Sequence, residues 1–240
     1  MGRAATYRES TETLAYVRKV YAWLLFGVAL CSGAAGLALN VGTPVETTFE
    51  KQTVTVPPIV AAVIEHPMAA GFLFIGLALA AAFARRAQGM MVPLYVFFTA
   101  FSGIFIGPAI FVAQLTASKG HTLSGHPLRD ALILTFMAFG SLTGYVFASR
   151  KDFSSWGSFL MTGLWVLIGA MFLAIFLGSN ALNLAISSIA VLLFAGFMVF
   201  DTWAILNKSD YDDPIGDALN LFLDLLNMFI NLLSILSSKK

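Results

Sequence analysis

The stretch LFAGFMVFDTWAIL, residues 193–206, decides what kind of fold this chain can adopt. Its residues are apolar, small or weakly polar, with the single exception of Asp201. Extended upstream to residue 181, the run is long enough to cross the hydrocarbon core of a bilayer, which needs about 20 helical residues. Ionisable side chains inside such helices are costly, and they usually mark functional sites. Asp201 is therefore the first candidate for a functional residue.

The rest of the chain shares this apolar character. Of its 240 residues, 58% are hydrophobic and 11% are charged, whereas soluble domains carry about 25% charged residues. The mean hydropathy is +0.83, which indicates an integral membrane protein whose surroundings are lipid. The formal net charge of +1 argues against a nucleic-acid partner. The single cysteine, Cys31, excludes an intrachain disulfide and is expected to be a buried small hydrophobe.

Seven apolar segments predict an all-α membrane fold, a bundle of seven transmembrane helices. They lie near residues 20–39, 59–84, 90–115, 129–149, 156–177, 181–206 and 217–236. We expect one membrane domain over residues 20–236, a cytoplasmic N-terminal tail over 1–19 and a C-terminal tail over 237–240. In the longest connection, residues 40–58, alternating Thr and Val predict a short extended stretch.

The distribution of Lys and Arg among the connections predicts the orientation of the bundle. Nine of these residues fall on one side: Arg3, Arg8, Arg18, Lys19, Arg85, Arg86, Arg150, Lys151 and Lys208. Three fall on the other: Lys51, Lys119 and Arg129. Since cytoplasmic loops carry the excess of positive charge, the N-terminus is predicted to be cytoplasmic. Seven full spans place Lys239 and Lys240 outside, whereas these two lysines favour a re-entrant last segment.

Paired glycines predict where helices approach closely. Gly103 and Gly107 form a GxxxG spacing in the third segment, and Gly140 and Gly144 form another in the fourth. Small residues at this spacing let two helix backbones come together in a membrane. We expect close packing at both pairs.

The last segment, DALNLFLDLLNMFINLLS, carries a polar stripe. Its members recur at spacings of three and four residues: Asp217, Asn220, Asp224, Asn227, Asn231 and Ser234. Such spacings place all of them on one face of a helix. A polar face is costly in hydrocarbon, so we expect it to line a protein interior or a water-filled path. The alternative is a helix that lies in the membrane interface with this face toward water.

Asp201 and Asp224 are expected to lie at similar depths. Asp201 precedes Asn207 by six residues and Asp224 follows Asp217 by seven, which is about 9–10 Å from either helix end. A short connection makes the two helices antiparallel neighbours, so the two carboxyl groups are able to meet. Two acids in a poorly solvated site cannot easily both ionise, and the pair is expected to share a proton.

Such a pair would sense pH, and in its doubly ionised form it would attract a cation. Calcium prefers oxygen ligands, and Asn220 and Asn227 lie one turn from Asp224 on the same stripe. We therefore predict that Asp201 and Asp224 bind or conduct Ca²⁺. The alternative is that each acid is a structural tie that caps or hydrogen-bonds neighbouring helices.

Arg85 and Arg86 end the second segment at the predicted cytoplasmic level. Both are expected to anchor the helix at the interface, and one could pair with Asp201, since arginine binds carboxylates bidentately. No arrangement of residues indicates an enzyme or a cofactor. The histidines, His66, His121 and His126, fall in or near the outward loops, away from the two acids.

Four stretches of the chain resemble the Bax inhibitor-1 family, also called the transmembrane Bax-inhibitor-motif family, in a bacterial form. They are TAFSGIFIGPAIF (99–111), TFMAFGSLTGYVFASRKDFSSWGSFL (135–160), FAGFMVFDTWAIL (194–206) and ALNLFLDLLNMFINLLSIL (218–236). The last two are similar to the family's aspartate-bearing sixth and seventh helices. Together they are the most specific part of the resemblance.

The resemblance implies a fold and a function. It implies seven helices with the last one central, in the bacterial inner membrane, and a pH-sensitive calcium leak. The family's paired aspartates correspond to Asp201 and Asp224, and its latch arginine to Arg85, with Arg86 as the neighbouring alternative. Two other functions stay open: an interaction protein that modulates a membrane protease or a stress or cell-death regulator, and a Ca²⁺/H⁺ exchanger.

Overall fold

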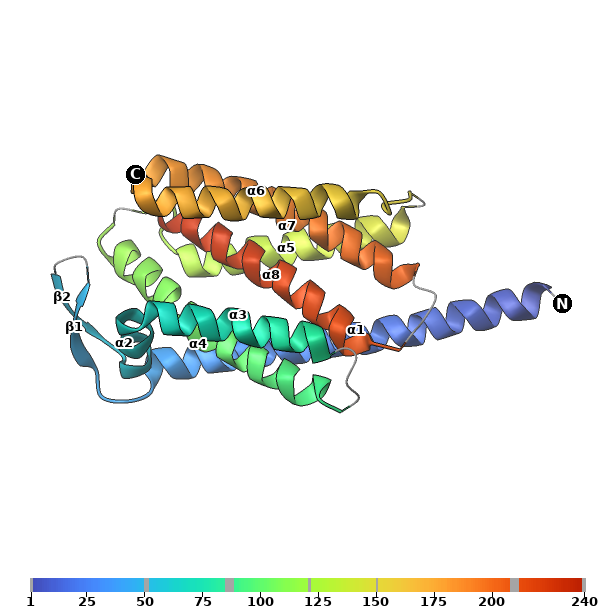
Figure 1. The fold of residues 1–240 in the computed structure, drawn as a ribbon, viewed down its shortest axis with the longest axis horizontal. Coiled ribbons are helices and arrows are strands. Elements are labelled where there is room, and N and C mark those ends of the chain that lie inside the picture. The colour runs from blue at the N-terminus through green and yellow to red at the C-terminus, as the bar shows by residue number, and fades with distance from the viewer. Residues whose placement is uncertain are drawn as a thin grey trace. The chain divides into compact units, whose positions relative to one another are not determined.

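The computed structural model describes residues 2–49, 52–84, 89–120, 122–149, 151–207 and 212–238, and these residues are almost entirely helical (Figure 1). They group into two compact units, which we describe separately. The first unit comprises Met1–Val17, Ala113–Tyr211 and Asn220–Lys240, and the second comprises Arg18–Val112 and Asp212–Leu219. Three long helices, α1 (Gly2–Asn40), α4 (Met91–Ser118) and α8 (Pro214–Ser237), contribute to both units.

The second unit contains a β-hairpin between its first two helices. Strands β1 (Val45–Phe49) and β2 (Gln52–Val56) pair antiparallel, with Val45 opposite Val56 and Phe49 opposite Gln52. Alternating Val and Thr residues favour such a ladder because β-branched side chains suit an extended backbone. The predicted extended stretch is confirmed.

The second predicted span is broken into two helices. The sequence predicts one helix over residues 59–84, but α2 (Pro58–Glu65) and α3 (Pro67–Ala84) meet at His66 with a bend of 92°. The reason is Pro67, because proline lacks an N–H group and disfavours the helical conformation of the residue before it. The prediction of a single straight helix was wrong.

Close packing of α1 and α4 in the second unit depends on small residues. A Cβ atom on Gly103 would overlap the carbonyl oxygen of Cys31 and lie 2.9 Å from the backbone nitrogen of Ala35. One on Gly107 would contact Ala38. The close approach predicted for Gly103 and Gly107 is confirmed, and Cys31 is buried as expected.

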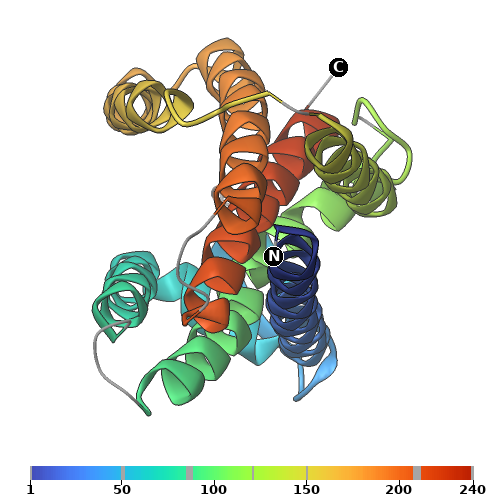
Figure 2. The ribbon, with the colours of Figure 1, turned by 90° about the vertical axis from the view of Figure 1, so that its right-hand side faces the viewer.

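The first unit is built around α7 (Asn180–Leu206). This helix packs against α5 (Pro127–Ala148) and α6 (Trp156–Leu177), and it runs beside α8 (Figures 1 and 2). Close approach occurs at glycines that the sequence analysis did not single out. A Cβ atom on Gly196 would lie 2.7 Å from Leu160, and one on Gly157 would lie 2.9 Å from the Phe200 ring.

The prediction of close packing at Gly140 and Gly144 was wrong. No heavy atom of a neighbouring element among the described residues lies within 4 Å of a Cβ atom built on either glycine. Both sit on α5, which exposes large apolar side chains such as Met137. Lipid can cover this face, because lipid tails replace the apolar contacts that a second helix would make.

The lengths and surfaces of the helices are those of an integral membrane protein. Within the described residues, six helices are long and apolar enough to cross a membrane, and the bent α2–α3 pair makes a seventh if it counts as one span. The exposed side chains include Phe159 at 75% and Phe176 at 84% exposure. Apolar surface on this scale marks a lipid-facing or partner-facing protein rather than a soluble monomer. The chain is an all-α integral membrane protein.

The last helix is the one most covered by protein. More than half of the residues in the most apolar part of α8 are buried, against less than half in each of the other five single-helix spans. α8 also runs along the length of α7. Asp224 faces Asp201 near one end of α7, and Ser234 hydrogen-bonds Ser187 near the other.

α8 ends beside the loop that joins α4 to α5. The backbone N–H groups of Leu123 and Ser124 donate to the carbonyl oxygens of Ser238 and Leu236. α8 is one continuous helix, long and apolar enough to cross a membrane, which fits the alternative of seven full spans. Lys239 and Lys240, which favour a re-entrant segment, lie outside the described residues.

Candidate functional site

The polar stripe of α8 is largely covered by protein. Asp217, Asp224 and Asn231 are each less than a tenth exposed, while Asn220 and Asn227 are half-buried. Ser234, near the helix end, is exposed. A helix lying in the membrane interface would instead turn this whole face toward water.

The amide side chains of the stripe are partly satisfied by their own helix. The Nδ2 group of Asn227 donates to the carbonyl oxygen of Leu223, and that of Asn231 donates to the carbonyl oxygen of Asn227, both at 2.8 Å. Bonds back to the preceding turn let a polar residue sit in an apolar helix. Their Oδ1 atoms have no hydrogen-bond partner among the described residues, so these two side chains offer oxygen acceptors to whatever faces them.

α8 begins earlier than the sequence predicts. The helix starts at Pro214, and the Oδ1 atom of Asp213 accepts a hydrogen bond of 2.8 Å from the N–H group of Gly216. An acidic cap followed by proline is a strong helix start. Asp224 therefore lies about 15 Å from the beginning of its helix instead of about 10 Å. The prediction that the two acids lie equally far from the ends of their helices was wrong.

Asp201 and Asp224 nevertheless lie together in the first unit. Their carboxyl groups are within hydrogen-bonding reach of each other, and Asp224 is only 5% exposed. The second carboxyl oxygen of Asp224, Oδ2, is buried and has no hydrogen-bond partner within the described parts of the chain. Two acids at this range in a poorly solvated site favour one proton between them.

An aromatic cluster holds the end of α7 that carries Asp201. Phe153, in the link between α5 and α6, is buried against Val146 and Val199, with Trp203 packed beside them. The Phe153 ring also makes an edge contact with Trp156 at 5.1 Å between ring centroids. Phe153 has no predicted role, although the run KDFS in the link marks it as an apolar residue in a polar turn.

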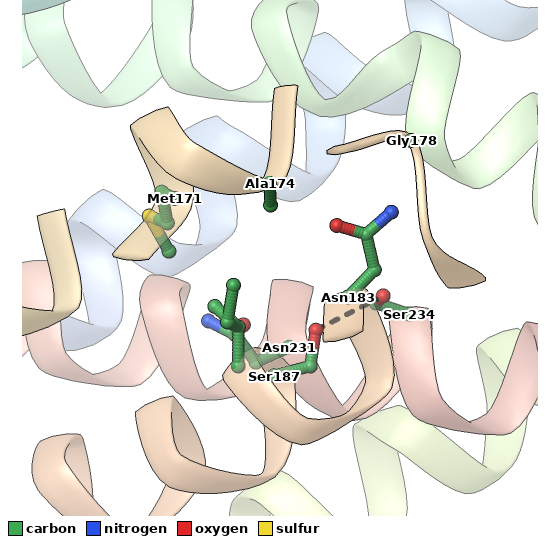
Figure 3. Close-up of a pocket in the computed structure, with 8 residues that line it drawn as sticks. Met171, Ala174, Gly178, Asn183, Ser187, Asn231 and Ser234 are labelled. Atoms are coloured by element: carbon green, nitrogen blue, oxygen red, sulfur yellow. Dashed lines mark hydrogen bonds between the residues drawn. The ribbon is translucent and has the colours of Figure 1, made fainter. Parts of the chain in front are cut away.

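A second polar region lies at the other end of the α7–α8 contact. Asn183 and Ser187 from α7 and Asn231 and Ser234 from α8 line a pocket closed on one side by the end of α6 (Figure 3). The Ser187 and Ser234 hydroxyl groups are 3.2 Å apart. The sequence alone does not single out Asn183 and Ser187, because a polar residue near the first turns of a helix resembles ordinary capping chemistry.

The structure does not test the predicted roles of the arginines and of the first acid in the stripe. Arg85 and Arg86 lie outside the described residues, and Asp217 belongs to the second unit. Among the residues that the structure describes, no group of three or more His, Cys, Asp or Glu side chains is placed to hold a metal ion. Calcium binding by Asp201 and Asp224 therefore stays a prediction, and it would need amide, carbonyl or water oxygens as further ligands.

The fold and the site define a class: an all-α membrane protein with a protein-covered polar helix and two facing acids. The family profile described as "Inhibitor of apoptosis-promoting Bax1" matches residues 13–240. The chain therefore belongs to the Bax inhibitor family. This is a family of membrane proteins and is not defined by an enzymatic reaction.

Its relatives come from viruses, eukaryotes and bacteria. The chain is 34% identical over 117 residues to the "Golgi anti-apoptotic protein" of vaccinia virus (strain Lister), covering 48% of this chain and 49% of the viral protein. It is 34% identical over 135 residues to "Bax inhibitor 1" of Schizosaccharomyces pombe, covering 53% and 51%. It is 25% identical over 235 residues to "Inner membrane protein YbhL" of Escherichia coli, covering 94% and 92%. The chain thus spans about half the length of the first two relatives.

Proposed function

We propose that this protein is a pH-sensitive calcium leak of a bacterial inner membrane, with its N-terminus in the cytoplasm. The observation that carries the proposal is the pair of facing carboxyl groups, Asp201 on α7 and Asp224 on the polar face of α8, which is largely covered by protein. Intramembrane acids that pair in this way mark ion pathways and proton relays. The Oδ1 atoms of Asn227 and Asn231 extend the polar face along α8 and suit a passing cation.

The gate works through the charge on the acid pair. With one shared proton the pair carries one negative charge, which Arg85 balances by pairing with Asp201. A second proton cancels that charge, removes the attraction for the arginine and favours the open state. The leak is therefore expected to rise as the cytoplasmic pH falls. No resident cofactor takes part, and Ca²⁺ is the cargo.

Two alternative functions stay open. One uses the same two acids, and the other is suggested by the family. In a Ca²⁺/H⁺ exchanger, each calcium ion would move against protons carried by the pair. In an interaction protein, the exposed apolar helices would bind membrane-protein partners such as a protease or a cell-death regulator. The name "Golgi anti-apoptotic protein" of the viral relative favours this second alternative.

The test is calcium flux into liposomes that contain only the purified protein, measured against internal pH. The wild type is expected to pass calcium, with a rate that increases toward acid pH. Asp201→Asn should give a high rate that no longer depends on pH, because the charge that holds Arg85 is absent. Absence of flux at every pH would favour the interaction protein, and a strict requirement for an opposing proton gradient would favour the exchanger.

A further inference from the structure

The pocket between α6, α7 and α8 has no part in the gate described above. Its volume is about 470 Å³, within the range of about 300–1,000 Å³ that is typical of small-molecule sites. Its described lining is of two kinds (Figure 3): Met171 and Ala174 of α6 form an apolar wall, while α7 and α8 supply all of the polar side chains. An occupant that fits both kinds of wall is an amphiphile.

The pocket lies where a membrane changes from polar to apolar. It begins at Gly178, in the link between α6 and α7, and reaches Met171, Ser187 and Asn231, which are six or seven residues inside their helices. This is a depth of about 10 Å, whereas the polar layer on each side of a bilayer is about 5–8 Å thick. Beside the pocket, α6 exposes apolar side chains such as Phe172. An amphiphile bound here keeps its polar group near the membrane surface and its chain toward the lipid.

The polar side chains of the pocket offer both hydrogen-bond donors and acceptors. Asn231 is 7% exposed, and since its Nδ2 group donates to Asn227, its Oδ1 atom is left as a buried acceptor without a partner among the described residues. The Ser187 hydroxyl group donates to that of Ser234 at 3.2 Å, which leaves the Ser234 hydrogen to donate elsewhere. The exposed Asn183 side chain adds an amide group. A matching ligand carries a donor for Asn231 and an acceptor for Asn183 and Ser234.

The pocket is also electrically neutral. Its described lining includes no Asp, Glu, Lys, Arg or His side chain. A phosphate, carboxylate or ammonium group would lose its hydration on entering and would gain no charged partner in return. A hydroxyl group next to an ester meets all of these demands, because the hydroxyl group donates, the carbonyl oxygen accepts and the attached acyl chain covers the apolar wall.

We infer that this pocket binds an acylglycerol, a neutral lipid with a free hydroxyl group beside a fatty-acid ester. The hydroxyl group donates to the Oδ1 atom of Asn231. The ester carbonyl oxygen accepts from Asn183 and Ser234, and the acyl chain lies against Met171 and Ala174. This binding uses neither of the two acids, so it does not depend on the proposed calcium leak.

Three ligands with the same hydrocarbon chain test the assignment. Glyceryl monooleate carries both polar groups, glyceryl monooleyl ether lacks the carbonyl group, and methyl oleate lacks the hydroxyl groups. Their dissociation constants come from the ligand-dependent rise in the thermal unfolding midpoint of the full-length protein in a maltoside detergent. Each analogue is expected to bind about fivefold more weakly than glyceryl monooleate, as the loss of one hydrogen bond predicts. Equal binding of all three ligands would overturn the site.

Two substitutions identify which side chain contacts which group. Asn231→Leu should weaken the binding of glyceryl monooleate and of its ether about fivefold, and leave that of methyl oleate unchanged. Asn183→Leu, at an exposed position, should weaken the two esters and spare the ether. The matched control is Ser188→Ala, because the exposed Ser188 hydroxyl group donates to Leu184 of its own helix and does not line the pocket. Ser188→Ala should change the binding of none of the ligands.

The same measurements contain the results that would reject the site. Equal weakening of all three ligands by Asn183→Leu, or weakening by Ser188→Ala, would show that binding does not occur through the assigned contacts. Tighter binding of lysophosphatidylglycerol than of glyceryl monooleate would contradict a neutral site. If Asn231→Leu does not fold, the ligand series and Asn183→Leu decide the matter without it.

Discussion

The surroundings of Asp224 and Asp201 determine whether the two acids share a proton, because an exposed pair of carboxyl groups would ionise fully. Asp224 is buried on α8, and its Oδ2 atom has no hydrogen-bond partner among the described residues. The Asn227 and Asn231 side chains donate to their own helix and not to the acid. Each acid is therefore expected to depend on the protonation state of the other.

The acid pair should behave as one unit in a double-mutant cycle. Asp201→Asn is expected to remove the pH dependence of calcium flux, and Asp224→Asn is expected to shift it toward lower pH, because Asp201 then titrates alone beside Arg85. The double variant should resemble Asp201→Asn. Flux measured from about pH 5 to pH 8 in liposomes checks this, and additive effects of the two single variants would indicate independent sites.

Arg85 is expected to hold the closed state through Asp201. Arg85→Ala should raise the leak at neutral pH, because the expected ion pair with Asp201 would be lost. The adjacent Arg86→Ala is the matched control and should have a smaller effect, since its predicted role is to anchor the helix at the interface. A leak raised by Arg86→Ala alone would move the latch by one residue, and no effect from either change would reject it.

At the scale of helices and strands, small residues allow two helices to touch. Their GxxxG spacing alone does not determine whether the helices do so. Gly103 of α4 and Gly140 of α5 both begin a GxxxG motif, yet one lies against the backbone of α1 and the other faces open space among the described residues. The spacing of small residues shows where a helix permits close approach of another backbone. Whether another helix approaches there depends on the paths of the other helices.

Substitution of the two glycines by alanine should therefore have opposite effects. Gly103→Ala is expected to destabilise the protein by about 1–3 kcal/mol, because the new Cβ atom overlaps backbone that cannot move aside. Gly140→Ala should be neutral or stabilising by up to about 1 kcal/mol, as expected for replacing a helical glycine without a steric cost. Thermal unfolding in detergent compares them, and equal destabilisation by both changes would contradict the packing described for α5.

At the scale of the whole molecule, the course of α8 determines on which side the chain ends. The helix leaves Asp201 near one end of α7, passes Ser187 near the other and ends beside the α4–α5 loop. If the proposed cytoplasmic N-terminus and seven crossings hold, we expect the C-terminus on the side of the membrane opposite the cytoplasm.

Cysteine accessibility in intact cells tests this topology. In a Cys31→Ala background, Ser238→Cys and Gly120→Cys, in the α4–α5 loop, are expected to react with a membrane-impermeant thiol reagent added outside. Ser154→Cys, in the link between α5 and α6, should react only after the membrane is permeabilised. Protection of Ser238→Cys together with labelling of Gly120→Cys would contradict a full crossing by α8.

The fold class followed from the sequence because it depends on local quantities. Runs of about 20 apolar residues must become helices in a bilayer, where each backbone group has to be satisfied within its own segment. This is why α6 and α7 begin and end within one residue of the segments predicted at 156–177 and 181–206. The polar stripe on α8 could be predicted for the same reason, since helical periodicity is a property of one segment.

Tertiary structure decided what depends on more than one segment. The open face at Gly140 and the pairing of α8 with α7 are set by the paths of neighbouring helices. Ser187 and Asn183 lie beside Asn231 and Ser234 only because α7, α8 and the end of α6 surround one recess. Sequence periodicity assigns a side chain to a face of its helix, but only packing determines whether that face meets lipid, another helix or a polar pocket.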